Sequence, residues 1–202
     1  LFQVKTSSAT QDEIEDEIGR LVQIIVLREE FKKSTSIFLQ EWNTTSGAPP
    51  LDAKTTLLYN KEFVHETLRI GDLNPLTFRV RPTTFFQTNS YACEKLYSKV
   101  VDLCKEFVSD DEHLTILDIC CGTGTIGLAV GSSLPKSKVL GIDIVESAIQ
   151  DAYENSVENK ITSTEYLVGD VRQYIDRLTN DIDGKCIAIV DPPRAGLHKN
   201  VR

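Results

Sequence analysis

The residues best suited to chemistry lie in one glycine-rich segment and at one acidic position beyond it. The segment reads Asp118-Ile119-Cys120-Cys121-Gly122-Thr123-Gly124-Thr125-Ile126-Gly127, which fits the pattern G-x-G-x-x-G. Glycines let the backbone turn tightly against a ligand, and a helix that follows offers unpaired N–H groups to an anion. Asp143, at the end of the next predicted strand, is placed to accept hydrogen bonds from two ribose hydroxyls. These features fit NAD and S-adenosyl-L-methionine equally well, and they also fit a strand-to-helix turn without a ligand.

Two further acids separate the two cofactors. Asp118 precedes the glycines, where it can receive the methionyl ammonium group of S-adenosyl-L-methionine but would repel a pyrophosphate. Asp191-Pro192-Pro193-Arg194 follows the fourth predicted strand, at the edge where open α/β sheets place their ligand crevice. The prolines stiffen that loop and hold the Asp191 carboxylate in place, although two prolines also serve as a plain strand terminator. The set favours S-adenosyl-L-methionine.

Strand and helix signals alternate through the second part of the chain, which must position these residues. We predict helices at 94–107, 125–132, 146–159 and 171–178, and strands at 114–120, 138–145, 165–168 and 186–190. This alternation predicts a parallel, doubly wound α/β sheet. Since only four of the expected strands are present, we expect an incomplete sheet in a piece of a longer protein.

The first part of the chain predicts a small α+β region. Thr10 and Glu13 have capping-box spacing before a helix with apolar residues at the helical period. Residues 1–7 alternate like a short strand. Short apolar or β-branched segments at 36–42, 55–59, 66–70 and 76–81 predict the strands of one small antiparallel sheet that the helix covers. We therefore divide the chain into a small region, 1–75, and the start of a catalytic domain, 76–202.

Composition limits the class of protein. With 41% hydrophobic and 26% charged residues among 202, the chain has ordinary globular usage. No apolar run is long enough for a membrane span and no signal peptide is recognisable, so we expect an intracellular protein of the cytoplasm, nucleus or mitochondrion. The net charge of −8 predicts weak RNA binding by this chain alone. The five cysteines form no C-x-x-C pair and the three histidines are scattered, so neither a disulfide framework nor a metal site is indicated.

Three ordered motifs resemble those of the RNA 5-methyluridine methyltransferases, in particular the eukaryotic tRNA (uracil-5-)-methyltransferases. They are Phe85-Phe86-Gln87-Thr88-Asn89, the stretch 117–125, and Asp191-Pro192-Pro193-Arg194-Ala195-Gly196-Leu197-His198. The resemblance is strong from about residue 65 onward. It implies a Rossmann-like S-adenosyl-L-methionine-dependent methyltransferase fold, here incomplete, and a tRNA substrate.

The same resemblance implies roles for single residues. Gln87 would contact the cofactor, Asp170 would lie near the adenine, and Cys120 would flank the cofactor. Asp143 would hold the ribose, and Asp191 would sit where the methyl donor meets uracil. The glycine-rich segment adds four residues to the predicted cofactor site, Gly122, Thr123, Gly124 and Thr125.

Enzymes of this family attack C6 of uracil with a cysteine thiolate, and a carboxylate base later removes the C5 proton. The resemblance places both groups downstream of the D-P-P-R motif, and none of the five cysteines present has the expected context. We therefore expect this chain to bind cofactor but to transfer no methyl group alone, with tRNA bound through the full-length protein. Two alternatives stay open: another S-adenosyl-L-methionine-dependent methyltransferase that uses D-P-P to recognise an amide, and a non-catalytic module that binds cofactor or protein.

Overall fold

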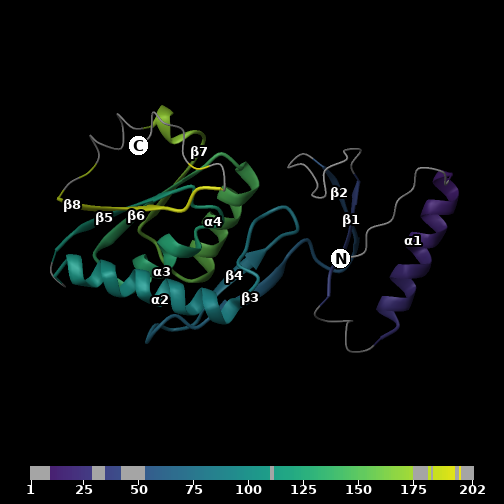
Figure 1. Cartoon of the computed structure of the whole chain (residues 1–202), viewed down its shortest axis with the longest axis horizontal. Coiled ribbons are helices and arrows are strands. Elements are labelled where there is room, and N and C mark those ends of the chain that lie inside the picture. The colour runs from purple at the N-terminus through teal and green to yellow at the C-terminus, as the bar shows by residue number, and fades with distance from the viewer. Residues whose placement is uncertain are drawn as a thin grey trace. The chain divides into compact units, whose positions relative to one another are not determined.

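The chain forms two compact units, Leu1–Val64 and His65–Arg202. The computed structural model describes residues 10–28, 35–41, 53–109, 112–174, 182, 184–193 and 196 (Figure 1). The division into units precedes the domain boundary expected between residues 75 and 76, which stays a prediction.

Helix α1 (Gln11–Val26) belongs to the first unit. The Thr10 hydroxyl accepts the Glu13 N–H, and the Glu13 carboxylate accepts the Thr10 N–H in return. This reciprocal pair satisfies two N–H groups that the first helical turn leaves unbonded, and it confirms the predicted capping box. No residue of α1 is buried. The strand predicted at 1–7 lies outside the described residues.

The short strands of the first part form two sheets. They are β1 (Ile37–Glu41), β2 (Lys54–Tyr59), β3 (Val64–Leu68) and β4 (Leu76–Val80). The prediction of one antiparallel sheet was wrong, because β1 pairs with β2 while β3 pairs separately with β4. The physical reason is burial: Leu68 and Phe78 are fully buried in the core of the second unit, which commits the β3–β4 pair to that unit.

A four-stranded parallel sheet forms the centre of the second unit, in the order β7-β6-β5-β8. Its strands are β5 (Leu114–Ile119), β6 (Ser137–Asp143), β7 (Thr164–Val168) and β8 (Lys185–Val190). Ile119 lies opposite Ile142 on one side and Val190 on the other, so the carboxyl ends of the strands meet at one edge. The predicted α/β class with parallel pairing is confirmed.

Three helices connect these strands and their neighbours: α2 (Ser90–Phe107), α3 (Thr125–Ser133) and α4 (Glu146–Glu158). Helices α2 and α3 lie together along one face of the sheet (Figure 1). The helix predicted at 171–178 is instead a single 3₁₀ turn, Val171–Gln173, where it is described; residues 175–178 lie outside the described part. Asp170 caps this turn by accepting the Arg172 N–H, a short-range bond that suits a tight turn.

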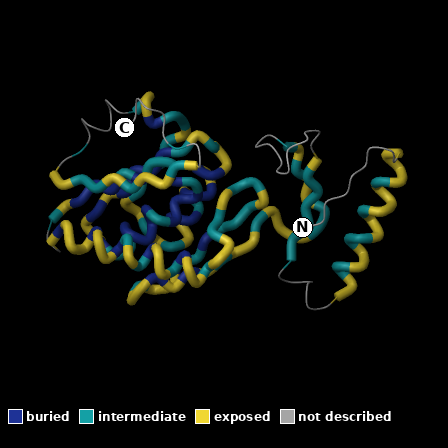
Figure 2. Tube along the Cα trace, viewed as in Figure 1, coloured by how far each residue is buried: buried dark blue, intermediate teal, exposed yellow. Residues whose placement is uncertain are grey.

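The core of the second unit lies between the sheet and its helices (Figure 2). Fully buried side chains come from every layer, including Phe78 of β4, Ile116 of β5 and Leu128 of α3. This continuity holds the loops at the carboxyl edge on a fixed base. Among the described helices, none is long and apolar enough to cross a membrane.

Candidate functional site

The glycine-rich loop joins β5 to α3 at the carboxyl edge of the sheet. Its backbone takes left-handed angles at Cys120 (φ 62°), Gly122 (φ 54°) and Gly124 (φ 76°). A hydrogen bond of 2.9 Å from the Gly124 N–H to the Cys121 carbonyl closes the turn. The N-cap of α3 is Gly124, which has no side chain to cap the helix, and in the first helical turn the Gly127 N–H bonds the Asp118 carboxylate instead. The sequence predicted a tight turn at the glycines. It did not reveal that Cys120 also takes left-handed backbone angles, which strain a residue that carries a side chain.

Asp143 lies beside this loop at the end of β6. Its Oδ2 accepts the Gly122 N–H at 2.9 Å and its Oδ1 accepts the Val145 N–H at 2.9 Å. A carboxylate oxygen has two lone pairs, so each oxygen keeps one for another donor. Asp143 therefore ties the loop to the start of α4, and each of its oxygens can still accept one more hydrogen bond.

Asp118 lies beneath the loop rather than at its surface. The residue is 2% exposed, and its Oδ2 accepts the Gly127 N–H at 2.9 Å. Burial raises the pKa of this carboxyl to about 7, the Gly127 bond opposes that rise, and the negative charges of Asp191 and Asp143 add to it. Asp118 thus holds the start of α3 against β5, and it titrates near neutral pH.

Two more acids follow the outer strands. Asp170 comes after β7, and its carboxylate pairs with the Arg172 guanidinium. Asp191 comes after β8, where its N–H points to the Ile119 carbonyl at 3.5 Å and its side chain is exposed. Arg194, the last residue of the D-P-P-R motif, lies outside the described residues.

The Cys120 thiol lies near enough to all four acids for their charges to act on it. Burial raises its pKa, and the charges of Asp143, Asp118, Asp191 and Asp170 each raise it further. The structure thus brings together five residues that the sequence singled out from four different strand ends. They meet because parallel strands in register deliver their carboxyl ends to one edge.

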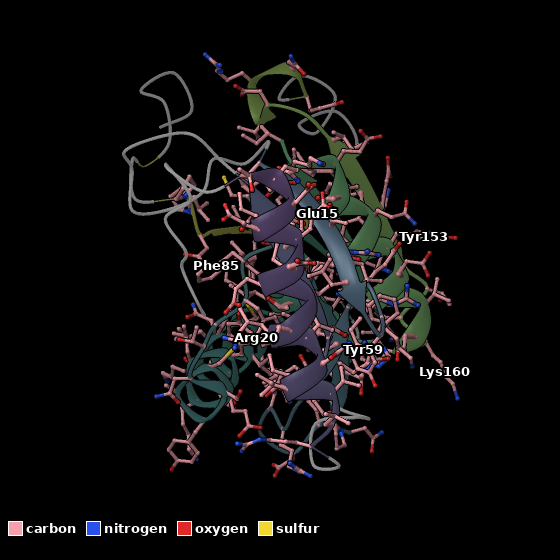
Figure 3. All side chains as sticks on the ribbon, turned by 90° about the vertical axis from the view of Figure 1, so that its right-hand side faces the viewer. Glu15, Arg20, Tyr59, Phe85, Tyr153 and Lys160 are labelled. Carbon is pink, nitrogen blue, oxygen red and sulfur yellow. The ribbon has the colours of Figure 1, made fainter. Side chains whose placement is uncertain are left out.

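Gln87 lies in the segment between β4 and α2. The Thr84 N–H bonds the Arg81 carbonyl at 3.3 Å, and Asn89 caps α2 by accepting the Ala92 N–H at 3.0 Å. Between them, the Phe86 ring packs on Phe78, with ring centroids 6.3 Å apart. Gln87 is therefore held between two fixed points, while its neighbour Phe85 is 76% exposed (labelled in Figure 3).

Helix α2 connects the Gln87 segment to the glycine loop. The buried Tyr97 hydroxyl lies 3.1 Å from Thr125 Oγ1, at the first residue of α3. Burial raises the pKa of Tyr97, and the negative charge of Asp191 contributes. Sequence reasoning missed Tyr97, because its only signal was an aromatic residue on the apolar face of a predicted helix.

Tyr166 of β7 is a second residue that the sequence did not single out. A Cβ on Gly141 would lie 2.5 Å from the Tyr166 ring, and one on Gly124 would lie 3.0 Å from its hydroxyl oxygen. The Tyr166 ring can therefore lie beneath the loop only because Gly141 has no side chain. A glycine inside an apolar strand signals such close approach, and it was the available clue.

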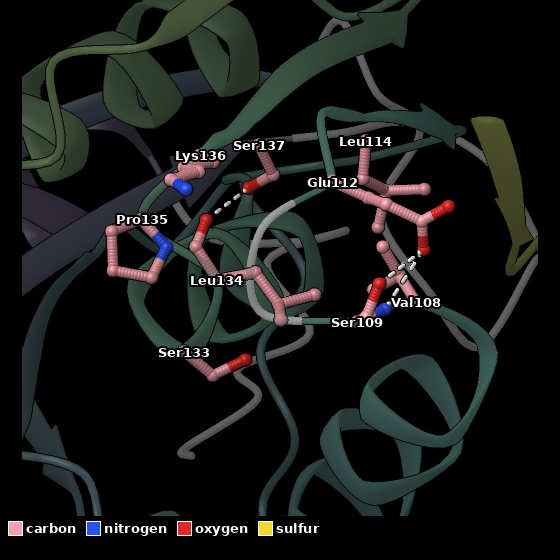
Figure 4. A pocket seen from close by; sticks show the side chains of 9 residues that line it. All are labelled: Val108, Ser109, Glu112, Leu114, Ser133, Leu134, Pro135, Lys136 and Ser137. Atoms are coloured by element: carbon pink, nitrogen blue, oxygen red, sulfur yellow. Dashed lines mark hydrogen bonds between the residues drawn. The ribbon is translucent and has the colours of Figure 1, made fainter. Parts of the chain in front are cut away.

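Two surface cavities of the described residues lie away from this edge. One, of about 240 Å³, is lined by residues around the amino ends of β5 and β6 (Figure 4), among them Ser109, Leu114 and Ser137. These strand ends are opposite the glycine loop. No group of three histidine, cysteine or acidic side chains able to hold a metal ion occurs within the described part of the chain.

Comparison with known proteins identifies the class. Residues 110–190 match the family model of a methyltransferase domain. An uncharacterized RNA methyltransferase of Clostridium tetani is 38% identical over 145 residues, covering 72% of this chain and 29% of that protein. The tRNA (uracil-5-)-methyltransferase homolog A of Mus musculus is 41% identical over 132 residues, covering 64% of this chain and 20% of that protein.

The chain carries a methyltransferase domain related to those of RNA methyltransferases. It spans between 20% and 29% of the length of these two relatives. The crystal structure of an S-adenosyl-L-methionine-dependent methyltransferase from Agrobacterium tumefaciens aligns with a TM-score of 0.49 at 18% identity, over 70% of this chain and 44% of that one. The fold assignment rests on the parallel sheet and the family match.

The match to a methyltransferase domain confirms the fold expected from the motifs, and it agrees with S-adenosyl-L-methionine as the methyl donor. The individual contacts predicted with that cofactor stay predictions. They concern Gln87, Asp118, Cys120, Gly122, Thr123, Gly124, Thr125, Asp143, Asp170 and Asp191.

Proposed function

We propose that this chain binds S-adenosyl-L-methionine along the carboxyl edge of its sheet, as the cofactor-binding part of an enzyme that methylates C5 of uridine in tRNA. The observation that carries the proposal is the gathering of four carboxylates around Cys120 and the glycine loop. Such an edge favours a ligand that brings positive charge. S-adenosyl-L-methionine brings an ammonium and a sulfonium group, whereas NAD brings a pyrophosphate.

The residues present fit this cofactor. Asp143 keeps a lone pair on each oxygen for the ribose hydroxyls, and the glycine loop beside it allows close approach of the backbone. When bound, the cofactor supplies an electrophilic methyl group. The chain's own residues bind and orient it: Asp143 at the ribose, Asp191 toward the methyl group and Asp170 toward the adenine, with Gln87 as a further contact to the cofactor.

The uridine chemistry needs a thiolate that this chain does not offer. Burial raises the pKa of each of the five cysteine thiols, so all five are protonated and weakly nucleophilic at neutral pH. Cys120 and Cys121 are nearest the proposed site, and carboxylates raise their pKa further. We therefore assign attack on C6 of uracil to a cysteine outside this chain, in agreement with the resemblance to 5-methyluridine enzymes.

Calorimetry of this chain with S-adenosylhomocysteine and with NAD tests the cofactor assignment. We expect measurable binding of S-adenosylhomocysteine and much weaker binding of NAD. Asp143→Asn removes one charged acceptor and should weaken S-adenosylhomocysteine binding by about 1.5 to 3 kcal/mol. Asp102→Asn, an exposed position on α2, is the matched control and should bind as the wild type does. Tighter binding of NAD, or unchanged binding by Asp143→Asn, would contradict the assignment.

Incubation with labelled S-adenosyl-L-methionine and tRNA tests the reaction, beside the full-length protein. We expect label at uracil C5 from the full-length protein and none from this chain, which at a net charge of −8 should also bind tRNA weakly at physiological salt. Label at uracil C5 from this chain would return Cys120 and Cys121 to consideration as nucleophiles. Methylation of an amide, or of no RNA at all, by the full-length protein would overturn the uridine assignment.

A further inference from the structure

Strand β4 has an unusual partner on the edge that faces away from β3. Asn159 Oδ1 accepts the Thr77 N–H at 2.9 Å, and Asn159 Nδ2 donates to the Thr77 carbonyl at 2.7 Å. One turn earlier on α4, Asn155 Oδ1 accepts the Arg79 N–H at 2.9 Å. Side chains of a helix thus satisfy backbone groups that a neighbouring strand would satisfy in a wider sheet.

A third contact extends this row toward the Gln87 segment. One turn before Asn155, the fully buried Asp151 carboxylate accepts the Arg81 Nε–H at 2.8 Å. Four residues of a helix span about 6 Å and two residues of a strand span about 6.6 Å. Residues 151, 155 and 159 can therefore each lie opposite one of residues 81, 79 and 77 in turn. The row ends at Arg81, where the turn that precedes Gln87 begins.

Asn155 differs from the other two because it also touches the glycine loop. Its Nδ2 donates to the Thr123 carbonyl at 3.0 Å, and the residue is fully buried. Thr123 lies between Gly122 and Gly124, the two left-handed glycines of the loop. One amide group therefore joins the loop on its donor side to β4 on its acceptor side.

We propose that Asn155 is a positioning residue that sets the glycine loop and the strand leading to Gln87 in one fixed relation, and that cofactor affinity depends on it. The proposal rests on the proposed cofactor site. It follows from the two hydrogen bonds of Asn155, because a shift of either partner must break a bond of a group that cannot reach water. Asn155 itself need not touch the cofactor.

Asn159 offers a matched control. Asn155→Ala and Asn159→Ala both remove bonds to β4 from the same helix, but only the first also releases the Thr123 carbonyl. We expect Asn155→Ala to weaken S-adenosylhomocysteine binding about tenfold and Asn159→Ala to leave the affinity within about twofold of the wild type. Equal losses of affinity in the two variants, or none in Asn155→Ala, would overturn the proposal.

Asn155→Asp separates the two bonds of this residue. It keeps an acceptor for the Arg79 N–H, but turns a second acceptor toward the Thr123 carbonyl, so we expect a loss of affinity at least as large as in Asn155→Ala. In the ligand-free variants, amide exchange at Gly124 should quicken in Asn155→Ala and Asn155→Asp but not in Asn159→Ala. That measurement tests the loop connection even if the wild type binds no S-adenosylhomocysteine, a result that would count against the proposed function alone.

The wild-type protein provides a test that depends on no variant being folded. Coupling between two sites is reciprocal, so a ligand held by the loop must also tighten the far side of Asn155. We expect saturation with S-adenosylhomocysteine to slow amide exchange at Arg79, bonded to Asn155, more than at Thr77, bonded to Asn159. Equal slowing at both amides would refute a role specific to Asn155.

Discussion

A buried carboxyl under the glycine loop should make the stability of this chain depend on pH. Burial raises the pKa of Asp118 to about 7 from an ordinary value of 3.8. In the unfolded chain the group ionises near pH 4, whereas in the folded chain it stays protonated until about pH 7. Between these values the folded state binds more protons, so the free energy of unfolding must fall as pH rises. The stabilisation that the protonated Asp118 gives the folded state is therefore complete below pH 4 and is lost by about pH 7.

The size of this effect follows from the pKa difference. A difference of about three, at about 1.4 kcal/mol for each, corresponds to about 4 kcal/mol of unfolding free energy lost between pH 4 and pH 7. Asp118→Asn keeps an oxygen that can accept the Gly127 N–H but cannot ionise. The variant should therefore lack this loss. Glu112, whose pKa Lys185 and Ser109 lower to about 2, acts in the opposite direction and only below about pH 4.5.

Urea denaturation of the wild type and of Asp118→Asn, followed by circular dichroism at half-unit steps from pH 4 to pH 8, measures the difference. We expect the wild type to lose about 4 kcal/mol more than the variant between pH 4 and pH 7, and the two curves to run parallel above that. Asp102→Asn should follow the wild type. Parallel curves for the wild type and Asp118→Asn over the whole range would show that Asp118 is ionised in the folded protein, and the electrostatic account of the loop would be wrong.

Three further substitutions test the packing and capping. Gly141→Ala should cost about 1 to 3 kcal/mol of stability, because its Cβ would meet the Tyr166 ring at 2.5 Å; chemical denaturation measures the loss. Tyr166→Phe should be neutral or stabilising by about 1 kcal/mol, since the buried Tyr166 hydroxyl has no hydrogen-bond partner among the described residues; a loss of stability would reveal a partner. Thr10→Ala should cost α1 about 1 kcal/mol, read as lost helical signal, whereas Thr10→Ser should preserve it.

The sequence predicted that the candidate acids lie at one edge of a parallel sheet, as they do in the structure, because local strand and helix signals combine with a general rule of sheet geometry. Apolar runs and helical periods marked β5 to β8 and their helices, and parallel strands place their carboxyl ends at one edge. Asp143 and Asp191 therefore had to lie near each other once the strands were known. The depth of Asp118 did not follow, because alternation in a strand buried on both faces does not show which side chains a following helix will cover.

Contacts between distant segments were beyond sequence reasoning. Asn155 lies inside α4 and Asn159 caps its carboxyl end, with no motif around either, and their β4 partners lie far away along the chain. The division into two small sheets was missed for the same reason. Each strand was recognised by its own residues, but its partner depends on which core buries Leu68 and Phe78.

The four carboxylates at the edge differ in how the chain compensates their charge, and this difference points to the one left for a ligand. Asp143 has two backbone N–H donors, Asp170 has Arg172, and Asp118 has Gly127 together with a pKa that favours its neutral form at mildly acidic pH. Asp191 is exposed, and no hydrogen bond or ion pair of its carboxylate occurs within the described part of the chain. The exposed Asp191 carboxylate faces solvent, so a cation or a hydrogen-bond donor can take the place of water around it. Asp191 is therefore the acid whose charge a bound cofactor or an incoming uracil N–H would satisfy, which is the position that the proposed function gives it.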